Sequence, residues 1–159
     1  MLKVLLGIAI VAFSTFCGYL LSKGYRQRKL FFAQFYEFNE RFLTEIAYYR
    51  RSLGDFLSSY TYQGEFDIVL KDFYVRLQDS KAVELSQWTF LKNEECIVIC
   101  DYFSMLGKGD STSQKTYFSA IRDTLLRYQR VTSEEAKKYE DLYIKIGFLC
   151  GLFILILII

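Results

Sequence analysis

Residues 28–49 read RKLFFAQFYEFNERFLTEIAYY. Apolar side chains recur in this stretch at intervals of four, three, four and four residues, at Phe31, Phe35, Phe38, Phe42 and Ile46. An α-helix turns once every 3.6 residues, so these five side chains share one face of a helix. Such a face has to be covered by other elements. The stretch therefore predicts the first helix of a packed bundle.

Shorter helical patterns follow this stretch. Ser52 can cap a short helix that runs to Tyr60, and Gly64 marks the turn after it. Residues 81–91, around Trp88, read as a further helix. Between them lies a third apolar stripe, formed by Phe66, Val69, Leu70, Phe73 and Leu77.

Asn93, followed by Glu94 and Glu95, predicts the start of the next helix. An asparagine side chain can cap the free backbone N–H groups there, and acidic residues favour the positive end of the helix dipole. We expect this helix to run to Leu106 and to stop at the glycines that follow.

The last helix is predicted to begin at Ser111, because Gln114 stands three residues later in the spacing of a capping box. Thr132 and Glu135 could form a second capping box and a break. We favour one long helix over a break, with a kink at that point left open. Since the chain has no proline, long uninterrupted helices are expected throughout. The predicted fold is all-α, an antiparallel helical bundle flanked by two transmembrane helices.

The flanking helices come from two uncharged apolar runs. Residues 4–22 form the first run, and its 19 residues would span about 28 Å as a helix, close to a ~30 Å hydrocarbon core. Residues 146–159, IGFLCGLFILILII, form the second. This run is short for a span, but it has no polar face, and a chain of 159 residues offers no core large enough to bury it. We predict a membrane anchor at each end.

Three alternatives to the first anchor find little support. A soluble core helix would not be followed at once by four basic residues. A cleaved signal peptide needs small residues after its apolar stretch, where Tyr19, Leu20 and Leu21 stand. A bacterial lipoprotein needs a small residue before its cysteine, and Phe16 precedes Cys17. We interpret residues 1–23 as a retained transmembrane helix, residues 24–143 as a cytoplasmic helical bundle and residues 144–159 as a second transmembrane helix.

Basic residues next to each run predict the orientation. The cytoplasmic side of a membrane protein usually carries the excess of lysine and arginine. Here that side is the middle of the chain, so both termini are expected to point outward from the cytoplasm. The residues predicted at the membrane interface are Lys23, Arg26, Arg28, Lys29 and Lys145.

The composition argues against an enzyme. The chain has no histidine, the commonest general base and metal ligand. Cys96 and Cys100 could supply half of a metal site, but the bundle has no other cysteine or histidine to complete it, so we read them as buried small residues. We expect no catalytic, cofactor or metal site. The bundle is nearly neutral, so nucleic-acid binding is not expected either.

Two motifs invite a second interpretation. Gly107 to Ser111 looks faintly like a phosphate loop, but it lacks the Walker pattern, and a helix stop explains it better. Tyr48, Tyr49, Arg50 and Arg51 read as residues that end a helix with their polar tips in water, with a partner or headgroup contact as the alternative.

Gly147 and Gly151 have the small-xxx-small spacing that lets transmembrane helices approach closely. We predict a helix-packing role for the pair. Glycine that is merely tolerated in lipid remains an equal alternative.

Several segments together resemble the stage III sporulation protein AB family of endospore-forming bacteria. The family's L-G-x-x-D-x-x-x-Q turn is similar to Leu106, Gly107, Asp110 and Gln114, with Gly109 inside it. The opening MLKVLLGIAIV, Glu45-Ile46-x-Tyr48 with Leu53, Trp88, and the terminal LYIKIGFLCGL are similar to the family as well.

This resemblance implies a non-enzymatic component of the channel between mother cell and forespore, in the mother-cell membrane. The implied partners are the other stage III channel proteins, above all the AA ATPase and the ring-forming AF and AG proteins, and a homo-oligomer is compatible with it. The soluble domain would be similar to those of type II secretion F platform proteins. The alternative function is a membrane-tethered adaptor that binds a soluble signalling protein.

Overall fold

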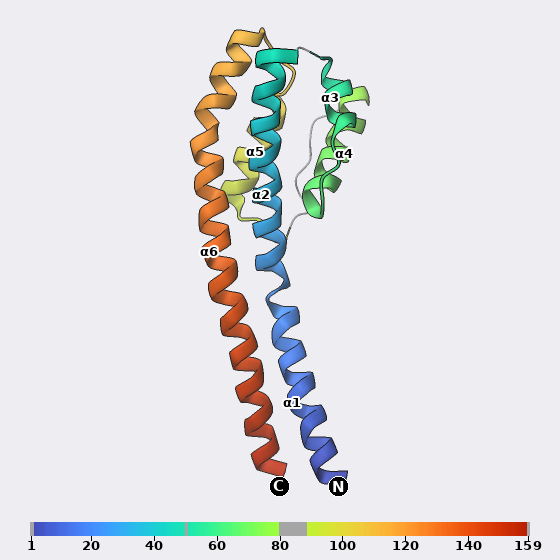
Figure 1. Cartoon of the computed structure of the whole chain (residues 1–159), viewed down its shortest axis with the longest axis vertical. Helices are drawn as coiled ribbons and strands as arrows, with labels where there is room; N and C mark the ends of the chain where they lie inside the picture. Colours follow the sequence, from blue (N-terminus) through green and yellow to red (C-terminus); the bar gives the residue numbers. More distant parts are fainter. Residues whose placement is uncertain (1, 50, 80–88, 159) are drawn as a thin grey trace. The chain divides into compact units, whose positions relative to one another are not determined.

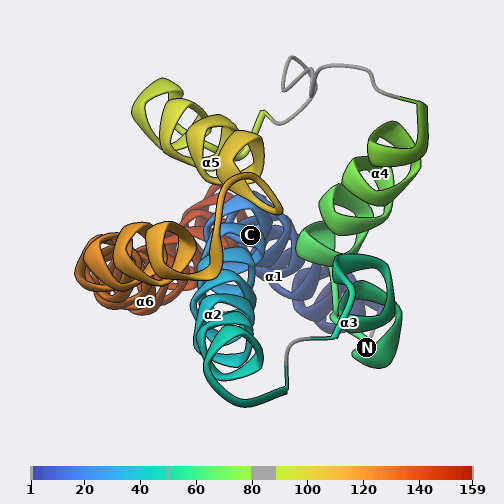
Figure 2. The same cartoon turned by 90° about the horizontal axis from the view of Figure 1, so that it is seen from above.

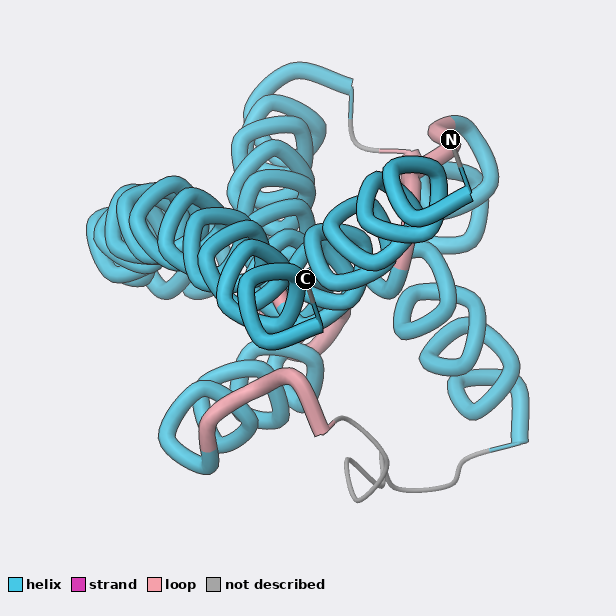
Figure 3. The backbone as a smooth tube through the Cα atoms, turned by 90° about the horizontal axis from the view of Figure 1, so that it is seen from below, coloured by secondary structure: helices cyan, strands magenta, loops and turns pink. Residues whose placement is uncertain are grey.

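The computed structural model describes residues 2–49, 51–79 and 89–158. Within these ranges the regular structure is entirely helical, as predicted, and Figure 3 shows helices joined by loops. A π-helical turn, η1, Glu45–Tyr49, extends the second helix. The helices, in order, are α1 Leu2–Leu21, α2 Lys23–Thr44, α3 Leu53–Ser59, α4 Glu65–Asp79, α5 Asn93–Met105 and α6 Ser111–Ile158 (Figure 1).

The chain divides into two compact units. The helix-pair unit joins Met1–Arg26 to Val131–Ile159, and the bundle unit is Gln27–Arg130. This division follows packing, whereas the limits predicted at residues 23 and 143 concern the position of a membrane. Those limits therefore stay a prediction.

The bundle unit is built around α2. Viewed from above, α3, α4, α5 and the first part of α6 lie around this helix (Figure 2). The predicted aromatic face is buried, with Phe31, Phe35 and Phe38 fully enclosed. The Phe35 ring contacts Phe66 of α4 and Tyr102 of α5, at 5.6 and 4.7 Å between ring centroids. Offset and edge-on aromatic contacts of this kind add to the stabilisation from burial alone.

The first part of α6 runs antiparallel to α2. Phe42 contacts Phe118, whereas Phe32, further back in α2, contacts Tyr128, further along α6. One residue number falls as the other rises, which is the pattern of antiparallel neighbours. The predicted antiparallel arrangement is thus present for this pair of helices.

Two helix starts differ from the sequence prediction. The residue before α5 is Lys92 rather than Asn93, and the Glu95 carboxylate accepts a hydrogen bond from the Lys92 N–H at 3.0 Å. Asp110 precedes α6, and its carboxylate accepts from the Thr112 N–H at 3.2 Å. Ser111 is therefore the first helical residue and not the cap. In both places a carboxylate accepts the hydrogen bond from a backbone N–H group. A carboxylate is favoured there over a neutral side chain because its negative charge lies at the positive end of the helix dipole.

Other local predictions are confirmed. Ser52 caps α3, with its hydroxyl accepting from the Asp55 N–H at 3.1 Å. Gly64 has a positive φ of 65° at the expected turn. α6 is a single helix of 48 residues that passes Thr132 without a break. Of the helix expected at 81–91, residues 81–88, with Trp88, lie outside the described residues, and residues 89–91 form a turn.

In the helix-pair unit, α1 packs along the last part of α6. Gly7 lies next to Leu155, whereas Gly18 lies next to Tyr143 and Gly147. The two helices are therefore antiparallel. By length and composition the helical stretch Leu6–Tyr49 holds one candidate membrane span, and only 17% of its most apolar window is buried within the protein. The second expected span, residues 144–159, stays a prediction.

Candidate functional site

Four buried glycines mark the closest approach of α1 and α6, and we call them the glycine seam: Gly7, Gly18, Gly147 and Gly151. A Cβ atom added to Gly147 would lie 2.7 Å from the Ser14 carbonyl oxygen. One added to Gly151 would lie 2.9 Å from the Val11 Cα. These neighbours are backbone atoms, which cannot move aside as a flexible side chain can. The helices can therefore approach this closely only because both positions are glycine.

A hydrogen bond crosses the same seam. The Ser14 hydroxyl donates to the Gly147 carbonyl oxygen at 2.7 Å. Hydrogen bonds between helices in a bilayer are worth about 0.6 kcal/mol on average and at most about 1.7. Gly147 and Gly151, the residues that the sequence predicts for helix packing, thus lie buried against α1.

The residues predicted at the membrane interface fall into two groups. Lys23 and Lys29 are exposed, and Lys145 pairs with Asp141 at 2.6 Å on the surface of α6. Arg26 lies 3.7 Å from Glu140 and stacks on the Tyr19 ring. The interface role of these four residues stays a prediction.

Arg28 does not fit the prediction. Its side chain is buried in the bundle unit, and its guanidinium donates through Nε to both carboxylate oxygens of Glu95, each at 3.0 Å. A guanidinium held in this way is not available to lipid headgroups. The sequence pattern could not separate it from its neighbours, because the position of Glu95 across the bundle decides its burial.

The bundle unit contains a cavity of about 250 Å³, which we call the turn cleft. It brings together two segments that are far apart in the sequence. The first runs from the end of α2 to the start of α3, and the second is the glycine turn with the first turn of α6. Ile46 and Leu53 line it from the first segment, and Gly107 and Gln114 from the second. Two of the segments that carry the family resemblance therefore meet in one place.

Each residue of the predicted turn motif has a defined role in the glycine turn. Leu106 is buried, and Gly107 and Gly109 have positive φ angles of 78° and 82°. Asp110 caps α6, and hydrogen bonds from the Ser113 hydroxyl and nearby backbone N–H groups hold its pKa below the usual range. The Gln114 amide donates to the Lys108 carbonyl oxygen at 3.1 Å, so it closes the turn and not the helix start.

An ion pair forms one wall of the turn cleft. The buried Glu45 carboxylate accepts from Arg51 Nε at 2.9 Å and from the Arg51 backbone N–H at 3.1 Å. These hydrogen bonds lower the pKa of Glu45. Tyr48 and Tyr49, between the two, are 80% and 65% exposed, and Arg50 lies outside the described residues. Two exposed tyrosines therefore lie in the sequence between the two residues of this ion pair.

The two cysteines of the bundle unit show no sign of an activated thiol. Cys96 and Cys100 are half-buried rather than buried as predicted. Their partial burial raises the pKa of both thiols, which keeps them protonated at neutral pH. Among the residues that the structure describes, no three histidine, cysteine, aspartate or glutamate side chains gather as a metal site would require.

Sequence reasoning missed the partners of the terminal glycines. Gly18 in α1 belongs to the seam and Ser14 donates across it, and these two residues are also four positions apart. The same small-xxx-small spacing that marked Gly147 and Gly151 could have found them.

Sequence reasoning also missed Asn39 in the bundle unit. Its buried amide donates to the Phe118 carbonyl oxygen and accepts from the Tyr102 hydroxyl, at 3.2 and 3.1 Å.

Comparison with known proteins adds the family. Searches of curated proteins and of solved structures returned no match. The family model for stage III sporulation protein AB matches residues 3–159, which includes the glycine seam, the turn cleft and both apolar ends. The chain therefore belongs to the stage III sporulation protein AB family.

Proposed function

We propose that this stage III sporulation protein is a membrane scaffold that couples a cytoplasmic ATPase to membrane-embedded proteins of the channel between mother cell and forespore. The observation that carries the proposal is the family match over residues 3–159, because it covers both apolar ends together with the bundle between them. The scaffold has no catalytic role. It would hold the ATPase next to the membrane-embedded channel proteins.

The glycine seam supports the membrane part of this function. Two helices that approach through glycines form a stiff hairpin, because close backbone packing and the Ser14 hydrogen bond fix their register. A single anchor would tether the bundle by one end of the chain only, whereas the seam holds both apolar ends together. In this model the hairpin lies in the mother-cell membrane, with both termini outward and the bundle in the cytoplasm.

The end of α2 supports the partner part. Tyr48 and Tyr49 are largely exposed, in the short segment between Glu45 and Arg51. Tyrosine is enriched among the residues that dominate binding energy in protein interfaces. The bundle would present this surface to the ATPase. Ring-forming channel proteins would contact the hairpin.

A gene replacement tests the function. In an endospore-forming host, deletion of the gene should stop sporulation after engulfment, and the wild-type gene should restore it. The double variant Tyr48→Ala/Tyr49→Ala should recover the ATPase in pull-downs at about a tenth of the wild-type level or less, because two interface anchors are removed. Ile68→Ala on α4, which removes a side chain that is 58% exposed, is the matched control.

Three results would count against the scaffold model. Normal spores from the deletion strain would remove any need for the protein in sporulation. Recovery of a soluble kinase or protease without the ATPase or a ring protein would instead favour the adaptor function. Labelling of a single cysteine at Lys115 from outside intact cells would contradict the cytoplasmic position of the bundle.

A further inference from the structure

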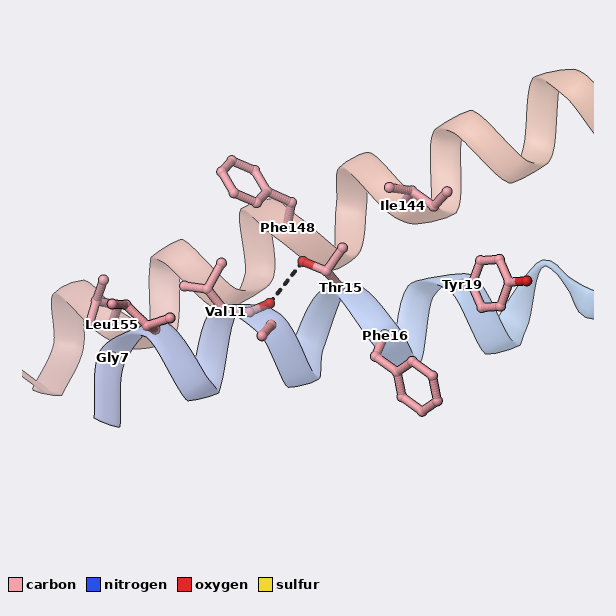
Figure 4. Close-up of a pocket in the computed structure, with 10 residues that line it drawn as sticks. Gly7, Val11, Thr15, Phe16, Tyr19, Ile144, Phe148 and Leu155 are labelled. Carbon is pink, nitrogen blue, oxygen red and sulfur yellow. Dashed lines mark hydrogen bonds between the residues drawn. The ribbon is translucent and has the colours of Figure 1, made fainter. Parts of the chain in front are cut away.

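The helix-pair unit has a groove of about 870 Å³ along one side of α1 and α6 (Figure 4). Small residues, Gly7 and Ala12, form part of its lining, and the Phe16 and Phe148 rings add larger walls. Thr15 also lines the groove, but its hydroxyl already donates to the Val11 carbonyl oxygen at 2.8 Å. The surface offered to an occupant is therefore apolar.

The two ends of this groove differ. Gly7 and Leu155 close one end with apolar surface. Tyr19 stands at the other end, where the Arg26 guanidinium lies 3.7 Å from the centroid of its ring. Arg26 is partly exposed, and its contact with Glu140 is long, at 3.7 Å. Since a guanidinium carries five N–H donors, it can bind a phosphate group while it keeps these contacts.

The charge at one end of the groove selects among apolar occupants. Gly7 and Tyr19 are separated by about 18 Å along α1, at 1.5 Å per residue, so the groove follows most of the predicted span at residues 4–22. A long apolar groove that begins beside a guanidinium matches a molecule with an apolar chain and an anionic headgroup, which is the chemistry of an anionic lipid. A partner transmembrane helix would cover the apolar surface but would supply no anion for Arg26.

We propose that this groove is a binding site for an anionic phospholipid. One acyl chain lies between α1 and α6, and the phosphate group pairs with Arg26. Lys23, which is exposed at the same end of α1, adds positive charge for the headgroup. A lipid can reach the groove only if the helix pair lies in a membrane, so the inference rests on the proposed function in that respect.

Native mass spectrometry of the full chain in detergent tests the site, with phosphatidylglycerol and phosphatidylcholine of identical acyl chains as probes. Phosphatidylglycerol should be retained over phosphatidylcholine. Arg26→Gln should reduce that preference about fivefold, the contribution of one basic residue near an anionic headgroup. Lys137→Gln, which removes an exposed charge elsewhere on α6, should leave the preference unchanged.

Ala12→Phe should fill the groove and abolish retention of both lipids. Ala9→Phe is the matched control, because Ala9 is exposed on α1 but does not line the groove. Equal retention of the two lipids by the wild type, or equal effects of the two phenylalanine variants, would overturn the site. A dimer that disappears only in Ala12→Phe would overturn it as well, because a second copy would then be the occupant.

Membrane extraction separates failure of this site from failure of the proposed function. If the wild-type chain stays in carbonate-washed membranes but shows no lipid preference, the lipid site is wrong and the scaffold model stands. If the chain is washed off, the membrane part of the proposed function is wrong.

Discussion

Arg28 and Glu95 form an ion pair that is almost completely enclosed in the bundle unit, with side-chain exposures of 7% and 2%. The residues are 67 positions apart in the chain, so the pair locks the start of α2 to the start of α5. The Glu95 carboxylate also accepts a hydrogen bond from the Lys92 N–H at the amino end of α5. One carboxylate thus serves both the tertiary contact and the helix cap.

Removal of either charge should be costly. Glu95→Gln leaves a buried guanidinium without its counter-charge, and breaking a buried pair in this way typically costs about 3–5 kcal/mol. The double variant Arg28→Met/Glu95→Gln should recover part of the loss, because no buried charge is then left alone. The free energy of unfolding of both variants can be measured by urea denaturation of the full chain in detergent, with near-ultraviolet circular dichroism as the signal.

A surface pair provides the comparison for this prediction. Lys71 and Asp67 lie 2.6 Å apart, but the lysine is 73% exposed. Lys71→Met should change the free energy of unfolding by less than about 1 kcal/mol. A Glu95→Gln effect as small as this one would show that the buried pair does not hold the bundle together.

The glycine turn offers a prediction with an internal control. Gly107 and Gly109 both have positive φ, so alanine at either carries backbone strain of roughly 1–2 kcal/mol. A Cβ at Gly107 would also lie 2.7 Å from Leu53 Cδ2, whereas at Gly109 the nearest neighbour is 3.8 Å away. Gly107→Ala should therefore lower the melting temperature more than Gly109→Ala. Leu53→Ala in the Gly107→Ala background should remove the extra loss caused by the clash; equal melting temperatures for the two single variants would contradict the predicted contact.

Glu45 predicts a change in acid stability. Its pKa is lower in the folded chain than the usual value of about 4.3, because Arg51 donates hydrogen bonds to the ionised carboxylate. The stabilisation is therefore complete above the unfolded pKa, and it disappears as the pH falls through the lower folded pKa. Glu45→Gln should be less stable than the wild type at pH 7, and the gap should narrow below about pH 4.3. A gap that stays constant from pH 7 to pH 3 in denaturation experiments would exclude this role.

The glycine seam predicts a steric effect on the helix pair. Gly147→Ala places a Cβ against the Ser14 backbone, and overpacking of this kind costs about 1–3 kcal/mol. Gly24→Ala is the matched control, because no atom lies within 4 Å of the added Cβ. The first variant should lose its monodisperse gel-filtration peak at a lower temperature than the wild type. The second should not, and similar behaviour of the two would mean that the seam is not closely packed.

Local features of the fold were predictable because they depend on neighbours in the sequence. The spacing of Phe31, Phe35 and Phe38 identified the buried face of α2, and the cap of α3 followed from Ser52. The predicted start of α5 was wrong by one residue. Asn93 was chosen because asparagine is a favourable capping residue. The Glu95 side chain, held in place by Arg28, instead caps the Lys92 N–H.

The candidate site was predictable only in halves. The sequence marked Gly147 and Gly151, but not Ser14 on the facing helix. It marked the turn at Gly107, but not its contact with Leu53. Periodicity identifies a face of a helix and says nothing about which other helix will cover it.

The sequence by itself determined the helical fold, the two apolar ends and the family, because these follow from local spacing, hydropathy and motif order. Only the tertiary structure decided the burial of Arg28 by Glu95, the register of the glycine seam and the meeting of α2 with the glycine turn. Each of these depends on residues far apart in the chain. Their pairing is decided by how whole helices pack, since a buried charge or a missing Cβ has meaning only against the surface that faces it.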